Sequence, residues 1–210
     1  PEFVTAQIDA VFGDLAVDAV KIGMVSRRET IEAIVGGLQH WRAKNIVVDP
    51  VMIATSGDLL LSPSALEALR DTLIPLAQVV TPNLPEAAAL LGEPMARTEN
   101  GIIGQGERLL RLGCPVVLIK GGHGEGPDAI DYLFSADGIV PLAAPRIATA
   151  NTHGTGCSLS SAIAAGLAKG EALEIAVRHA KDFISAAIVA AGRLDVGHGH
   201  GPIHHFYALD

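Results

Sequence analysis

The sequence predicts an α/β fold, with a doubly wound, mostly parallel sheet flanked by helices on both faces and a small antiparallel hairpin. Short apolar strand segments alternate with segments of helical periodicity along most of the 210 residues. Hydrophobic residues make up 49% of the chain but aromatic residues only 4%, so aliphatic side chains must fill the core, as suits a sheet covered on both faces. No repeat, linker or low-complexity segment divides residues 1–210, which we expect to form one domain.

Each element follows from local patterns. Helices are expected where apolar residues recur three or four positions apart, at 1–15, 28–41, 63–76, 83–91, 107–112, 158–169 and 173–192. Ser62 and Pro63 suit the N-cap and first position of one helix, while Asn83 opens another that Gly92 ends. Short apolar runs predict strands at 19–24, 45–49, 78–81 and 115–120. Segments 131–134 and 139–142, joined across 136–138, predict the hairpin.

Composition narrows the class of partner. The net charge is −8 and no basic block is present, which argues against nucleic acid or an anionic membrane surface. The sequence contains no apolar run of about 18 residues and no signal peptide. Its two cysteines, Cys114 and Cys157, are far apart and form no disulfide or metal signature, so we expect a cytoplasmic protein.

Polar residues collect where the predicted strands end. Asp49 closes one strand, Thr81 closes the next and is followed by Asn83 and Glu86, and Lys120 closes a third. In open parallel sheets, ligands bind beyond the carboxyl ends of the strands. We therefore expect these side chains to share one ligand-binding edge.

A glycine-rich turn, Asn151-Thr152-His153-Gly154-Thr155-Gly156-Cys157, runs directly into an alanine-rich helical segment. Such a turn directs free backbone N–H groups at one point, where the helix dipole favours negative charge. The same dipole lowers the pKa of a thiol, which would make Cys157 a better base or nucleophile. The alternative is a structural turn with a buried cysteine acting as a small hydrophobic residue.

The other candidates also have structural alternatives. Asn83 and Glu86 have the spacing of a capping box, but two acids on a phosphate-binding edge, Asp49 and Glu86, also favour Mg²⁺. Asp49 could equally be a turn residue before Pro50. Lys120, which precedes two glycines, either extends into solvent or contacts phosphates. The histidine-rich tail, from Gly197 to His205, is expected to be a solvent-facing loop or a loop at a pocket rim rather than a metal site.

Taken together, these motifs resemble the hydroxymethylpyrimidine and phosphomethylpyrimidine kinases of thiamine biosynthesis, in the ribokinase-like superfamily. The resemblance rests on Val48-Asp49-Pro50-Val51-Met52, Thr81-Pro82-Asn83-Leu84-Pro85-Glu86, Lys120-Gly121-Gly122-His123, the run from Asn151 to Cys157, and Gly199-His200-Gly201-Pro202. It covers essentially the whole chain. It also implies that the family's N-terminal segment, which carries its first strand and part of the pyrimidine pocket, is not in this sequence.

The resemblance implies ATP-dependent phosphorylation of 4-amino-5-hydroxymethyl-2-methylpyrimidine and then of its monophosphate. We expect direct transfer with Cys157 as the base, and not a covalent phosphate intermediate on Cys157. Most ribokinase-like enzymes carry Asp at that position. By the same resemblance, the anion hole for the transferred phosphoryl group would comprise Gly154, Thr155, Gly156 and Cys157.

The remaining implied roles concern the nucleotide, the metal and the pyrimidine. Asn83, Lys120 and Thr152 would serve ATP, Asp49 and Glu86 would serve Mg²⁺, and Met24 and Val51 would line the pyrimidine pocket. A homodimer is also implied. Two alternatives stay open: a pyridoxal or pyridoxine kinase, and a non-catalytic pyrimidine-binding module.

Overall fold

The computed structural model describes residues 1–52, 60–124, 126–196 and 198–209. Its strands are β1 (Val20–Ile22), β2 (Ile46–Val48), β3 (Val79–Val80), β4 (Val117–Ile119), β5 (Asp128–Ser135) and β6 (Gly138–Pro145). Its α-helices are α1 (Glu2–Asp14), α2 (Arg28–His40), α3 (Pro63–Ala68), α4 (Leu84–Leu91), α5 (Glu99–Leu110), α6 (Thr155–Ala168) and α7 (Leu173–Ala190). The strands form one sheet in the order β1-β2-β3-β4-β5-β6.

The sheet confirms the predicted mixed topology. Strands β1 to β4 pair in parallel, each joined to the next by a crossover that contains one or more helices, whereas β5 pairs antiparallel with β4 and β6. The hairpin is longer than predicted because pairing extends from Ser135↔Gly138 to Asp128↔Pro145. Gly138 has a φ of 129° at the turn, a conformation that an L side chain disfavours.

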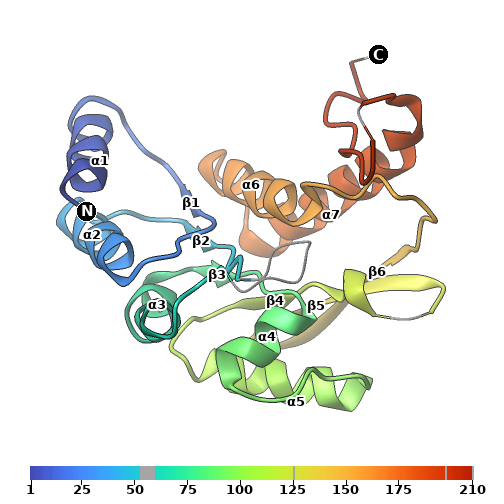
Figure 1. Ribbon diagram of the computed structural model, residues 1–210, viewed down its shortest axis with the longest axis horizontal. Coiled ribbons are helices and arrows are strands. Elements are labelled where there is room, and N and C mark those ends of the chain that lie inside the picture. The colour runs from blue at the N-terminus through green and yellow to red at the C-terminus, as the bar shows by residue number, and fades with distance from the viewer. Residues whose placement is uncertain (53–59, 125, 197, 210) are drawn as a thin grey trace.

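Helices cover both faces of the sheet, as Figure 1 shows with α6 and α7 on one side and α3, α4 and α5 on the other. Adjacent residues of a strand point to opposite faces. In β2, Val47 packs with the cluster under α6 and α7, while Ile46 and Val48 pack with the cluster on the opposite face. The alternation in β4 is the same, with Leu118 on the α6 and α7 side. The two hydrophobic clusters therefore share one sheet.

The segment predicted as one helix over 63–76 is α-helical only to Ala68. A π turn follows at Leu69–Leu73 and a 3₁₀ turn at Ile74–Leu76. Pro75 explains the difference, because its ring lacks an N–H and collides with the carbonyl that an α-helix would place beneath it. The start was predicted correctly: Ser62 Oγ accepts a hydrogen bond from Ala65 N at 3.2 Å.

Two other helices begin earlier than predicted. α5 begins at Glu99 with Thr98 as N-cap, where glycines had obscured the helical periodicity. α6 begins at Thr155, so Cys157 lies inside its first turn and not in the preceding loop. Its N-cap, Gly154, has a φ of 85°, which glycine adopts far more easily than other residues.

Helix α1 rests on α2 and has no fully buried residue. The lone tryptophan, Trp41, holds the two together, since its indole N–H donates to Asp9 Oδ1 at 2.7 Å and its ring stacks on Phe12. Ile8 also packs so closely on Gly37 that a side chain there would collide with it. Among the described residues, no helix combines the length and apolar character needed to cross a membrane.

Candidate active site

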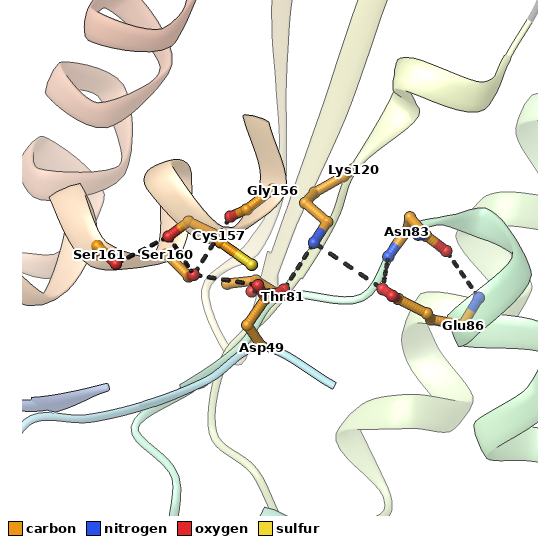
Figure 2. Close-up of polar contacts among 9 residues, drawn as sticks. All are labelled: Asp49, Thr81, Asn83, Glu86, Lys120, Gly156, Cys157, Ser160 and Ser161. Carbon is orange, nitrogen blue, oxygen red and sulfur yellow. Dashed lines mark hydrogen bonds and ion pairs between the residues drawn. The ribbon is translucent and has the colours of Figure 1, made fainter. Parts of the chain in front are cut away.

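The candidate site lies at the edge of the sheet where the parallel strands β2, β3 and β4 end. Asp49, Thr81 and Lys120 directly follow these strands, so parallel pairing places all three at this edge. Figure 2 shows the side chain of Lys120 between those of Asp49 and Glu86, with the first turn of α6 on the other side of Asp49. The structure thus brings together acids and a lysine that are widely separated in the sequence.

Asp49 is the centre of this network and is fully buried. Its Oδ1 accepts hydrogen bonds from Lys120 Nζ at 2.7 Å and from Thr81 Oγ1 at 3.1 Å. Its Oδ2 lies 3.2 Å from the hydroxyl of Ser160, on α6. A buried carboxylate needs such partners, because an unpaired charge away from water is very costly. Asp49 is therefore more than a turn residue before Pro50.

Glu86 lies on the far side of Lys120, with its Oε2 3.8 Å from Nζ. The capping box is present: Asn83 Oδ1 accepts from Glu86 N, and Glu86 Oε2 accepts from Asn83 N, both at 2.8 Å. Burial raises the pKa of the Glu86 carboxyl, although Lys120 and backbone hydrogen bonds from Asn83 and Met52 act to lower it. The cap thus holds this acid beside the lysine.

Lys120 does not extend into solvent. Its side chain is only 13% exposed, and its backbone N–H donates to Pro82 O at 2.8 Å. Its ammonium also approaches α6 so closely that a methyl group added at Gly156 would lie 3.1 Å from Nζ. The position of Lys120 therefore depends on both Asp49 and the glycine in the first turn of α6.

The first turn of α6 presents backbone donors beside this lysine. The ladder of helical hydrogen bonds begins with Ser158 N to Gly154 O at 2.9 Å, so the amides of Gly156 and Cys157 precede it. The side chain of Cys157 is exposed, which excludes its interpretation as a buried structural thiol. Thr155 Oγ1 donates back to Thr152 O at 2.6 Å and closes the turn.

Residues after α7 hold the loop that leads into α6. His153 N donates to Gly201 O at 3.0 Å, and Asn151 Nδ2 donates to Ala191 O at 3.0 Å. Near the end of the chain, His205 Nε2 lies 2.7 Å from the hydroxyl of Ser158. The first two contacts fix the loop before α6, and the third connects the first turn of α6 to the end of the chain.

Met24 and Val51 are not part of the network around Lys120. They follow the neighbouring strands β1 and β2 at the same edge of the sheet. Met24 is 59% exposed, and Val51 is half-buried.

The donor chemistry of this edge suits a hard cation in company with phosphate. Among the described residues, no group of three or more His, Cys, Asp or Glu side chains is placed to hold a metal ion. Two carboxylates, Asp49 and Glu86, are nevertheless close to one another across Lys120. Mg²⁺ is commonly held by one or two carboxylates, with water and substrate phosphates completing its shell, so these residues fit that ion.

Sequence reasoning did not identify Ser160 as part of the site. It is fully buried, and besides Asp49 its hydroxyl lies near the carbonyl oxygens of Gly156 and Cys157. Ser160 stands among other serines, Ser158 and Ser161, so the available signal was its position four residues after Gly156 and one residue after the apolar Leu159. It pointed to the face of α6 that lies against the sheet edge.

Comparison with known proteins identifies the family. The model of the phosphomethylpyrimidine kinase family matches residues 1–204. A hydroxymethylpyrimidine/phosphomethylpyrimidine kinase of Rhizobium meliloti is 58% identical over 206 residues, which are 98% of this chain and 77% of that protein. The Escherichia coli protein of the same name is 50% identical over 208 residues, covering 99% of this chain and 78% of its own length.

Solved structures agree in fold. The ADP complex of Bacillus subtilis pyridoxal kinase has a TM-score of 0.90 at 35% identity, over 97% of this chain and 76% of that one. Phosphomethylpyrimidine kinase from Clostridium difficile has a TM-score of 0.77 at 42% identity, over 89% of this chain and 76% of that one. The predicted ribokinase-like fold and phosphotransferase class are confirmed. The chain belongs to the phosphomethylpyrimidine kinase family.

Proposed function

We propose that this site transfers the γ-phosphoryl group of ATP to 4-amino-5-hydroxymethyl-2-methylpyrimidine and then to its monophosphate, in thiamine diphosphate biosynthesis. The observation that carries the proposal is the position of Lys120, whose ammonium lies between Asp49 and Glu86 and against the first turn of α6. Phosphoryl transfer depends mainly on positioning and on stabilising the charge of the transferred group.

In this proposal, Gly154, Thr155, Gly156 and Cys157 form the anion hole. The amides at the start of α6 and its dipole favour negative charge at this point, and they need no rearrangement during the reaction. Lys120, Asn83 and Thr152 serve the nucleotide, with the Lys120 ammonium directed at its phosphates.

Cys157 acts as the base. The oxygen of the substrate's hydroxymethyl group attacks the γ-phosphorus as the bond to the leaving ADP oxygen breaks, and the hydroxyl proton passes to Cys157 Sγ. The exposure of this side chain in the first turn of α6 supports the role, because an incoming hydroxyl can reach it. Direct in-line transfer requires no covalent intermediate on the cysteine.

Asp49 and Glu86 serve Mg²⁺ in the same proposal. When bound, the ion supplies neutralisation of phosphate charge. Asp49 already accepts from Lys120 and Thr81, so it would orient the water bound to the ion, and Glu86 would serve the ion together with the nucleotide.

The proposal also covers the pyrimidine pocket, the cellular compartment and the oligomeric state. Met24 and Val51 line the pyrimidine pocket, since both follow strands that end at this edge. The protein works in the cytoplasm and engages neither nucleic acid nor a membrane surface, which accords with a net charge of −8. A homodimer is proposed from the family resemblance.

A direct substrate comparison tests the proposed function. Initial rates of ATP-dependent phosphorylation are measured with the hydroxymethylpyrimidine, its monophosphate and pyridoxal, each over a range of concentrations. We expect kcat/KM to be highest for the two pyrimidines. Pyridoxal kinase is the second candidate, favoured by the TM-score of 0.90 to the Bacillus subtilis pyridoxal kinase, and a clear preference for pyridoxal would establish it. Pyrimidine binding in calorimetry without turnover of any substrate would instead support a binding module.

A further inference from the structure

A second buried ion pair, Asp131 with Lys181, lies next to the turn that follows Lys120 at the end of β4. Lys181, on α7, donates from Nζ to Asp131 Oδ2 at 2.7 Å and to Ala129 O at 2.9 Å. The side chain of Asp131, on β5, is 8% exposed and that of Lys181 is 12% exposed. None of the site roles described above uses this pair.

The other oxygen of Asp131 reaches the candidate site through the backbone. Asp131 Oδ1 accepts a hydrogen bond from Gly121 N at 2.7 Å, and Gly121 directly follows Lys120. Gly121 also lies so close to β5 that a side chain at this position would overlap the carbonyl oxygen of Ile130. Only glycine permits this approach, which brings the Gly121 amide within reach of the carboxylate.

We propose that Asp131 and Lys181 are positioning residues that fix the turn after β4 and thereby hold the Lys120 ammonium in place for nucleotide phosphates. This inference rests on the proposed function. The backbone of Lys120 is fixed on one side by its hydrogen bond to Pro82 and on the other by that of Gly121 to Asp131. Lys181 Nζ orients the Asp131 carboxylate through Oδ2, and Asp131 Oδ1 in turn accepts from Gly121 N, so α7 acts on the site through two hydrogen bonds.

A purely structural role for the pair would be to attach α7 to β5. The two roles differ in one respect. A structural pair affects ATP binding to the same degree whether or not Lys120 is present, whereas a pair that acts through Lys120 loses its effect when Lys120 is removed. Residues that act through one another give non-additive changes in a double-mutant cycle.

The experiment measures the Kd of Mg·ATP by calorimetry for Lys181→Met, in the wild-type background and together with Lys120→Met. We expect Lys181→Met alone to raise Kd about tenfold, since a small misplacement of a positioning group is costly. In the Lys120→Met background it should change Kd by less than about twofold. Arg178→Met is the matched control, because Arg178 is a cation on the same helix whose ion pair with Glu174 is exposed. It should leave Kd unchanged.

Two further variants guard against loss of folding. Asp131→Asn/Lys181→Met removes both charges together, and replacing a whole buried pair is far better tolerated than removing one partner. It should raise Kd for Mg·ATP like Lys181→Met, with thermal stability closer to wild type. Lys181→Arg restores the charge and should recover most of the lost affinity. In steady-state assays, the KM for ATP should rise while the KM for the pyrimidine stays within about twofold.

The outcomes separate this inference from the proposed function. If Lys120→Met weakens ATP binding but Lys181→Met has the same effect in both backgrounds, the positioning role is wrong and the role of Lys120 stands. If Lys120→Met leaves Kd unchanged, the phosphate contact of Lys120 is wrong and the positioning inference falls with it. An effect of Lys181→Met that disappears in the Lys120→Met background supports both.

Discussion

Removing the ammonium of Lys120 should destabilise the fold as well as weaken nucleotide binding. In Lys120→Met, the Asp49 carboxylate, whose side chain is 1% exposed, keeps as side-chain donors among the described residues the hydroxyls of Thr81 and Ser160. Breaking a buried ion pair by removing one partner costs about 3–5 kcal/mol, because the remaining charge is uncompensated. For a chain of this size, each kcal/mol lowers Tm by about 2–4 °C, so we expect a fall of about 6–20 °C.

Urea unfolding followed by far-UV circular dichroism measures this loss. Arg178→Met provides the control, because its exposed pair with Glu174 should contribute only about 0.3–0.5 kcal/mol. The double variant Asp49→Asn/Lys120→Met removes both charges of the closer pair and should recover part of the free energy of unfolding, because Glu86 still lacks the ammonium that lies 3.8 Å away in the wild type. A loss below about 1 kcal/mol in Lys120→Met, or a double variant no more stable than the single one, would refute the reasoning.

Three other predictions concern catalysis by Cys157, the titration of Glu86 and the reactivity of the two cysteines. Cys157→Ser should lower kcat by at least about 100-fold with little change in the Kd of Mg·ATP, because a serine hydroxyl is a poorer base; near-normal turnover in steady-state assays would exclude the role. Burial raises the pKa of Glu86 above its ordinary 4.5, so the folded state binds its proton more tightly than the unfolded state. As the pH rises from 4.5 through the raised pKa, the Tm of the wild type should therefore fall relative to the Tm of Glu86→Gln. A difference in Tm between the two proteins that does not change with pH would contradict this. Iodoacetamide should modify Cys157 and spare Cys114, since Cys114 is 2% exposed and burial raises the pKa of its thiol to about 11. Peptide mass spectrometry showing comparable rates at both thiols would contradict that expectation.

Much of the fold could be predicted because its signals are local. Apolar runs such as Ile46–Val48 gave the buried strands, and the spacing of Asn83 and Glu86 gave a capping box that the structure contains. Element lengths were less predictable. Pro75 ended an α-helix several residues earlier than the apolar pattern suggested, through a π turn that no propensity indicates.

The candidate site was predictable only in part, for a physical reason. Parallel strands place their carboxyl ends together, so the gathering of Asp49 and Lys120 could be expected from the order of the strands. Which groups pair at that edge depends on side-chain packing between residues far apart in the chain. The hydroxyl of Ser160 reaches Asp49 across 111 positions, and Lys181 reaches Asp131 across 50. No local pattern encodes either contact.

The way α1 is attached has a consequence for spectroscopy. The only tryptophan, Trp41, contacts α1 through Asp9 and Phe12, and α1 has no fully buried residue of its own. Such a helix can detach at a lower free energy than the sheet it flanks. Tryptophan emission should therefore change before the circular dichroism signal as urea is added. The protein thus contains a natural reporter of local opening at its N-terminal helix, separate from global unfolding.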